Sequence, residues 1–147
     1  MGGMNSMEKY LKVSAKKEEL ERVQSFIDTI LEEQQFPMQA ILQVDIAIEE
    51  LFVNIVYYAY DNVVEETDKV VEVVCKISDK NVVEIELKDC GKEFNPLERK
   101  EPDITLPEEE REIGGLGIYM VKKIMDGVEY ERKNLQNIIR IYKKNSL

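Results

Sequence analysis

The sequence of 147 residues predicts an α/β fold, in which a mixed, mostly antiparallel sheet is covered on one face by helices. Segments with helical hydrophobic spacing alternate with runs of strand-like segments, which is the pattern of a two-layer α/β sandwich. Strand-like segments that follow one another closely can pair as antiparallel hairpins. The length is that of one ordinary domain, so we expect a single domain over residues 1–147.

The first half of the chain is expected to hold one strand and two helices. Residues 9–13 are predicted to form a short strand, and Ser14 after it can cap the first helix. That helix ends before the dipeptide Phe36-Pro37. Because proline is suited to the first turn of a helix, a second and longer helix is predicted over residues 38–60.

The middle of the chain predicts an antiparallel hairpin. Its strands are residues 70–78 and 82–88, joined by the polar turn 79–81. In the second strand apolar and charged residues alternate, and Asp89 comes next on the apolar side. A carboxylate beneath the helices needs a partner, so Asp89 is a candidate functional residue.

Residues 96–113 contain three prolines and many acidic residues, with little periodicity. The segment is longer than a routine connection in a compact domain, so we predict a lid. A glycine-rich turn follows and leads into a helix that ends near Met125, and residues 128–132 and 137–143 are expected to form a closing hairpin. The predicted order of elements is therefore βααββ, lid, αββ.

Charge and hydropathy exclude several classes of function. The net charge of −10 repels a phosphate backbone, so direct binding of nucleic acid is not expected. The acidic surface favours a basic protein partner or simply maintains solubility. No apolar stretch approaches the roughly 18 residues of a membrane span. Residues 1–7 lack the features of a secretory signal, so we expect a disordered leader or cloning remnant and a cytoplasmic protein.

The chain has no histidine. This excludes Ser-His-Asp and Cys-His catalysis, histidine metal sites and a phospho-accepting histidine. A general base must therefore be a carboxylate, a lysine or a tyrosine. Cys75 and Cys90 lack CxxC spacing, so they are expected to be ordinary thiols and not zinc ligands.

Glu50 and Asn54 form the first candidate constellation. Being four residues apart, they project from one stripe of the second predicted helix. Such a pair is often a solvated surface. The functional interpretation is that the Asn54 side-chain oxygen ligates Mg²⁺ while Glu50 accepts a proton from an attacking hydroxyl.

The segment from Asp89 to Pro96 is the second constellation. Asp89 and Gly91 can be explained as an Asx and glycine turn at the end of a strand. Alternatively, a desolvated Asp89 carboxylate can accept a hydrogen bond from an adenine amino group, and Gly91 can let the base approach the backbone. Phe94 follows within the same segment.

The third constellation is the turn Gly114-Gly115-Leu116-Gly117 at the start of a helix. Backbone N–H groups and the positive end of a helix can bind phosphates there. The turn is neither a Walker P-loop nor a Rossmann fingerprint, so a different nucleotide-binding fold is required. Arg111 is the basic residue best placed in sequence to neutralise phosphates, although it can equally be an ordinary surface charge.

Taken in order, the three constellations resemble the N, G1 and G2 boxes of the GHKL superfamily, which includes gyrase, histidine kinases and MutL. The similarity runs over residues 13–144 and looks like the branch of bacterial anti-sigma-factor serine/threonine kinases. The motifs that carry it are Glu50-Leu51-Phe52-Val53-Asn54, Tyr58-Ala59-Tyr60, Asp89-x-Gly91-x-x-Phe94-x-Pro96, Gly114-Gly115-Leu116-Gly117-Ile118 and Met125-Asp126.

The resemblance implies a Bergerat ATP-binding fold with ATP and Mg²⁺ as cofactors. In it, Glu50 matches the general base, Asn54 the Mg²⁺ ligand and Asp89 the aspartate that binds adenine. Gly91 belongs to the same base pocket. The residues matching the phosphate-side loop beneath the lid are Gly115, Leu116 and Gly117.

Members of this branch typically dimerise, sequester a sigma factor and phosphorylate a STAS-domain anti-anti-sigma protein. The leading hypothesis is therefore an ATP-dependent protein serine/threonine kinase. The alternatives are a nucleotide-gated protein that sequesters a partner without phosphorylating it, and an interaction domain that no longer binds ATP.

Two residues depart from the family pattern. Tyr58 stands where histidine is common. Arg140 lies near a position often held by threonine, so the polar contact to the base at that position is in doubt.

Overall fold

A computed structural model describes residues 6–60, 68–98 and 115–146, apart from the side chains of Gly115 and Leu116. The elements are β1 (Met7–Ser14), η2 (Lys17–Glu19), α1 (Leu20–Glu33), α2 (Met38–Asn54), η3 (Ile55–Ala59), β2 (Val70–Ile77), β3 (Val82–Asp89), η5 (Pro96–Glu98), α3 (Gly115–Ile124), β4 (Gly127–Lys133) and β5 (Gln136–Lys144). This order confirms the predicted βααββ and αββ segments. Most of the predicted lid lies outside the described residues.

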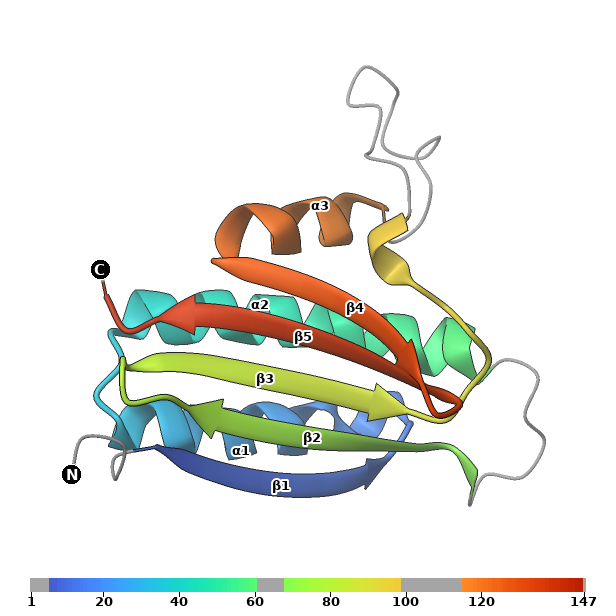
Figure 1. The fold of residues 1–147 in the computed structure, drawn as a ribbon, viewed down its shortest axis with the longest axis horizontal. Coiled ribbons are helices and arrows are strands. Elements are labelled where there is room, and N and C mark those ends of the chain that lie inside the picture. Colours follow the sequence, from blue (N-terminus) through green and yellow to red (C-terminus); the bar gives the residue numbers. More distant parts are fainter. Residues whose placement is uncertain (1–5, 61–67, 99–114, 147) are drawn as a thin grey trace.

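The strands form one five-stranded sheet in the order β1-β2-β3-β5-β4. All four pairings are antiparallel, including both predicted hairpins, so the prediction that the sheet is mixed is wrong for the described strands. The helices pack against one face of this sheet (Figure 1), with α2 in contact with both α1 and α3. The two-layer α/β architecture expected from the sequence is therefore confirmed.

The hydrophobic core lies between the sheet and the helices. In β3 the inward side chains are Val83, Ile85 and Leu87, all buried, and Asp89 is buried in the same alternation. The opposite side of the core comes from α2, where Ile48 and Phe52 are completely inaccessible to solvent. The predicted inward position of Asp89 is thus confirmed.

The beginnings of both long helices differ from the prediction. Ser14 remains in β1, paired with Val70, so it does not cap a helix. The turn η2 precedes α1, whose N-cap residue Glu19 makes no side-chain capping bond. Pro37 is the N-cap of α2 and not a residue of its first turn. β1 also begins at Met7, so the last residue of the expected leader belongs to the sheet.

The helix predicted over residues 38–60 changes character at Asn54. The α-helical part ends there, and Ile55–Ala59 form a turn of π-helix. The Asn54 side-chain amide donates to the carbonyl of Glu50 at 2.6 Å, so it competes for an acceptor of the regular helical ladder. π-turns of this kind are frequent at functional sites.

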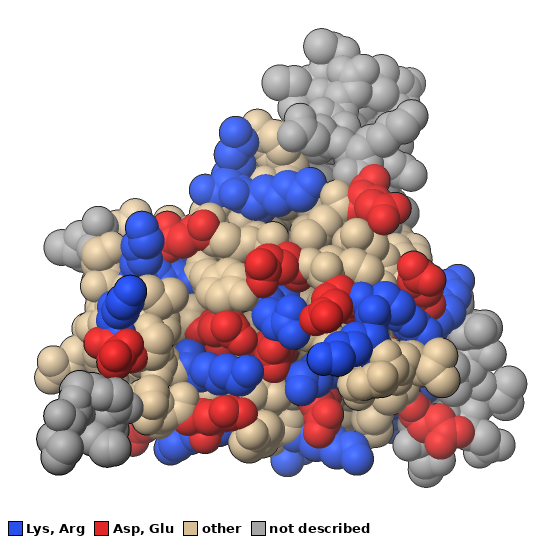
Figure 2. All heavy atoms as spheres, in the orientation of Figure 1, with Lys and Arg blue, Asp and Glu red and all other residues tan. Residues whose placement is uncertain are grey.

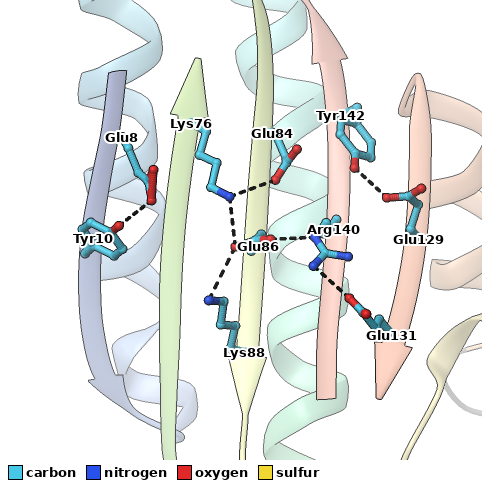
Figure 3. Close-up of polar contacts among 10 residues, drawn as sticks. All are labelled: Glu8, Tyr10, Lys76, Glu84, Glu86, Lys88, Glu129, Glu131, Arg140 and Tyr142. Atoms are coloured by element: carbon cyan, nitrogen blue, oxygen red, sulfur yellow. Dashed lines mark hydrogen bonds and ion pairs between the residues drawn. The ribbon is translucent and has the colours of Figure 1, made fainter. Parts of the chain in front are cut away.

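The face of the sheet away from the helices is charged. Lys and Arg side chains alternate with Asp and Glu across it (Figure 2), and no positive region dominates that view. At its centre Glu86 is buried among charged side chains (Figure 3), with Arg140 Nε at 2.6 Å and the ammonium groups of Lys76 and Lys88 each at 3.7 Å.

In the described part of the chain, no helix is long and apolar enough to cross a membrane.

Candidate functional site

The three predicted constellations meet at one end of the molecule. The C-terminal end of α2, the end of β3 and the beginning of α3 lie on the same side of the fold (Figure 1). Direct contacts join them, since Glu50 lies against Gly117 and the loop after Asp89 is hydrogen-bonded to the end of η3. Segments widely separated in the sequence therefore form one site.

Asn54 has the chemistry of a cation ligand. The residue is 3% exposed, and its side-chain nitrogen is held by the Glu50 carbonyl. Its Oδ1 atom is buried and has no hydrogen-bond donor among the described residues. A buried oxygen without a partner is costly, and an amide oxygen is a normal ligand of Mg²⁺. The residue therefore fits the metal role implied by the resemblance.

In the described ranges, Asn54 is not joined by a cluster of other metal-ligating side chains. Within the described ranges, no cluster of three or more histidine, cysteine, aspartate or glutamate side chains could hold a metal ion. Mg²⁺ usually takes one or two protein ligands and completes its coordination with phosphate oxygens and water. A single amide oxygen is within the number of protein ligands that Mg²⁺ usually takes.

Glu50 is half-buried where α2 meets α3. Burial, and to a smaller extent the charge of Glu49, raise the pKa of Glu50. A β-carbon at Gly117 would overlap the Glu50 carboxylate, so only glycine leaves room for it. Gly117 therefore makes space for Glu50 within the first turn of α3, a role that the sequence did not indicate.

The predicted phosphate-binding turn is only partly described. α3 begins at Gly115, which confirms that this turn opens a helix. The positive end of that helix is where anions bind most readily. Gly114 and Arg111 lie outside the described residues, and of Leu116 only the backbone is described.

Asp89 is buried and hydrogen-bonded. Its Oδ1 atom accepts the backbone N–H of Gly91 at 2.9 Å and the side-chain amide of Asn137 at 2.8 Å. Burial raises the pKa of Asp89, while these two hydrogen bonds and the charge of Arg132 act to lower it. The carboxylate is therefore held in place by its own loop and by the neighbouring strand β5.

Gly91 is required by a close backbone approach. A β-carbon there would overlap the carbonyl oxygen of Ala59 and lie 2.9 Å from its side chain. The neighbouring Lys92 N–H donates to the same carbonyl at 2.9 Å. The backbone that approaches Gly91 is thus the end of the π-turn, which ties the loop after β3 to α2.

A small pocket borders Asp89. Its other lining residues are Leu51, Ile55, Leu87, Phe94, Pro96, Tyr130, Asn137 and Ile139. The cavity measures about 10 Å³, which is room for roughly one water molecule. Phe94 stacks on Tyr58 with ring centroids 5.3 Å apart. In the observed arrangement of side chains such as Phe94, this cavity is therefore too small for a purine.

A larger cavity of about 420 Å³ lies elsewhere on the sheet, between residues such as Ser6, Lys76 and Tyr142. It contains none of the predicted site residues. Volume alone would favour it over the pocket beside Asp89. The smaller pocket is lined by Asp89 and Phe94, so the predicted chemistry favours it.

The structure shows where Arg140, named above as a departure from the family, lies, and it adds a residue to the site. Arg140 points to the opposite face of the sheet, where it pairs with Glu86 and Glu131, so it cannot contact a base beside Asp89. Asn137 is the residue directly opposite Asp89 in the β3–β5 pairing. The alternation of Asn137, Ile139 and Ile141 in the last strand was a signal for this inward position.

Tyr60 also contributes in a way that the sequence did not indicate. Its hydroxyl donates to the carbonyl of Val70 and accepts the N–H of Cys90, each at 2.7 Å. The residue after Asp89 is therefore fixed to the end of η3 through this hydroxyl.

Comparison with known proteins gives a match to one family and matches to solved structures. Residues 13–143 match the family described as histidine kinase-like ATPase domain. The crystal structure of the RsbU and RsbW domains of Rv1364c from Mycobacterium tuberculosis superposes with a TM-score of 0.67 at 12% sequence identity. That match covers 94% of this chain but only 32% of the solved chain, and at this identity it shows the fold alone. A search of curated proteins gave no match.

Proposed function

Because the chain belongs to the histidine kinase-like ATPase domain family, we propose that this site binds Mg-ATP and that the protein is a serine/threonine kinase acting as an anti-sigma factor. The observation that carries the proposal is the buried Asn54 oxygen without a donor, in the same end of the fold as Asp89 and the start of α3. This combination supplies a ligand for the metal ion, a hydrogen-bond acceptor for the adenine base and a helix end for the phosphates.

Each residue has a defined role in this proposal. Asp89 accepts a hydrogen bond from the adenine amino group, and the N–H groups at the start of α3 bind phosphate oxygens. Asn54 holds Mg²⁺, which when bound neutralises charge on the phosphates. Glu50 removes the proton from the acceptor hydroxyl, and its raised pKa makes it a stronger base than an exposed glutamate.

The proposed partners follow from the resemblance of the motifs. We propose a STAS-domain anti-anti-sigma protein as the phosphorylated substrate, a sigma factor as the sequestered partner, and a cytoplasmic homodimer as the working form. Light scattering coupled to gel filtration measures the mass, and a monomer of 17.1 kDa at micromolar concentration would contradict the dimer.

A nucleotide-gated binding protein without kinase activity is the second candidate. It is favoured by the closed pocket, since nucleotide entry must then move Phe94 and so change the surface around it. The two candidates share every binding residue and differ only in whether Glu50 acts on a substrate hydroxyl.

Thermal unfolding tests nucleotide binding first. Ligand at 100 times its dissociation constant stabilises the folded state by about 2.7 kcal/mol. For a domain of this size the melting temperature should rise by about 5 to 10 °C. Asn54→Ala should lose most of the Mg-ATP effect, whereas Lys80→Ala, in the turn between β2 and β3, should keep it. An unchanged melting curve of the wild type in saturating Mg-ATP contradicts ATP binding.

Transfer of label from γ-labelled ATP to a STAS-domain protein then separates the two candidates. We expect the wild type to label the protein and Glu50→Gln to do so about 10²- to 10⁴-fold more slowly. Glu50→Gln should retain the Mg-ATP melting shift. Wild type that binds Mg-ATP but transfers no label supports the gated binding protein instead.

A further inference from the structure

Asn137 is the most extensively hydrogen-bonded side chain near the pocket. It is 4% exposed and lies at the start of β5. Its Nδ2 donates to Asp89 Oδ1 and to the carbonyl of Lys92, each at 2.8 Å. Its Oδ1 accepts from the Tyr130 hydroxyl at 2.6 Å, and from the Phe94 N–H and the Arg132 guanidinium at 3.2 Å.

These bonds use the full capacity of the amide. A side-chain amide offers two N–H donors and two oxygen lone pairs. Both donors of Asn137 are engaged within the protein, and its oxygen is met by three donors. The side chain therefore has nothing left to offer a nucleotide directly, and its effect on a ligand must pass through the groups that it holds.

The first of these groups is the Asp89 carboxylate. The two hydrogen bonds that the described residues make to it both end on Oδ1, one from Gly91 and one from Asn137. Two donors on one oxygen fix the plane of a carboxylate, so the direction of Oδ2 is fixed as well. Asn137 and Asp89 also face each other in the strand register, so the backbone of the sheet supports this geometry.

The second group is the loop that follows β3. Asn137 holds this loop at the carbonyl of Lys92 and at the N–H of Phe94. Phe94 and Pro96 line the same pocket as Asp89. Arg132 adds a further bond to the loop, from its guanidinium to the carbonyl of Gly91 at 2.9 Å. One amide thus links the carboxylate to the loop whose aromatic ring must move for a base to enter.

We propose that Asn137 is a positioning residue for base recognition, which holds Asp89 through Oδ1 so that Oδ2 meets the exocyclic amino group of a 6-aminopurine nucleotide. This proposal rests on the proposed binding of ATP. It assigns the discrimination between purines to the pair of Asp89 and Asn137, with Asn137 acting without touching the base.

The test compares two nucleotides that differ only in the recognised group. Purine riboside triphosphate lacks the 6-amino group of ATP. In the wild type, with Mg²⁺, we expect it to bind about 10- to 100-fold more weakly than ATP, because a hydrogen bond to a charged group is lost. In Asn137→Ala the ratio of the two dissociation constants should fall toward one, mainly through weaker binding of ATP.

A purely structural role for Asn137 gives a different result. It would weaken both nucleotides by the same factor and leave the ratio at its wild-type value, which overturns the proposal. Arg140→Gln is the matched control, because Arg140 is on the same strand but points to the other face. Its ratio should equal that of the wild type.

Asn137→Asp keeps the size of the side chain and serves if the alanine variant does not fold. Two adjacent carboxylates favour a shared proton, so Asp89 becomes a poorer acceptor at neutral pH. We expect a reduced preference for ATP that changes between pH 6 and 9, where the wild-type preference stays flat. A wild-type preference at every pH in this variant overturns the proposal. If the wild type binds neither nucleotide, the proposed ATP site fails first and this proposal fails with it.

Discussion

A pair of carboxyl groups between α1 and α2 gives a pH-dependent stability that can be measured. Asp28 and Asp45 each have a buried Oδ1 atom without a donor among the described residues. Asp28 on α1 is one of the charged neighbours of Asp45 on α2. Burial, followed by the hydrogen bond and charge of Asp28 and the charge of Glu32, raises the pKa of Asp45 from 3.8 to about 7.

The sign of the effect follows from the proton count. Between about pH 4 and pH 7 the folded state binds more protons than the unfolded state, so the free energy of unfolding falls as pH rises through this window and levels off above it. A shift of about three units corresponds to roughly 4 kcal/mol at 1.36 kcal/mol per unit. Asp45 is only half-buried, so solvent screening should reduce this to about 1 to 2 kcal/mol.

Asp45→Asn should remove this pH dependence, because an amide stays neutral and can donate to Asp28. At pH 5 the variant should match the wild type in stability, and at pH 8 it should melt about 2 to 8 °C higher. Thermal unfolding at pH 5, 6, 7 and 8 measures the difference. Glu49→Gln, an exposed change of the same charge on the same helix, should show no such trend. An equal difference at pH 5 and pH 8 for Asp45→Asn would refute the raised pKa of Asp45.

Three further substitutions test the packing around the site and on the open face of the sheet. Gly91→Ala meets the backbone of Ala59 and should destabilise the protein by about 1 to 3 kcal/mol in urea unfolding, with wild-type stability as the contrary result. In Gly117→Ala the new β-carbon meets only the flexible end of Glu50, so the free energy of unfolding should fall by less than about 1 kcal/mol. Phosphoryl transfer should nevertheless slow strongly, and an unaffected rate would contradict the placement of Glu50. Burial raises the pKa of Glu86, but Arg140, Lys76 and Lys88 lower it by more. Glu86→Gln should therefore reduce the free energy of unfolding by about 1 to 3 kcal/mol at pH 7, and by progressively less below pH 4.5. A loss of stability that does not change with pH would exclude the ion pairs.

Local periodicity in the sequence was sufficient for the elements and for part of the site. The alternation of β3 predicted that Asp89 points inward, and the four-residue spacing of Glu50 and Asn54 placed them on one helical stripe. Both predictions depend only on the geometry of a single strand or helix, which neighbouring residues fix. The roles of Arg111 and Gly114 in binding phosphate remain predictions.

Other features depended on contacts between distant segments. The pairing of Asp89 with Asn137 comes from the register of β3 and β5, although the two residues are 48 positions apart in the sequence. The fit of Glu50 against Gly117 comes from the packing of α2 on α3.

The sequence by itself therefore determined the order of the elements, the inward face of β3 and the residue types that could hold a nucleotide. Only the tertiary structure decided that Asn137 and not Arg140 supports Asp89, and that Gly91 and Gly117 make room for Ala59 and Glu50. The physical reason is that a side chain's direction follows from its own backbone, whereas its partner is set by strand register and helix packing across the whole core.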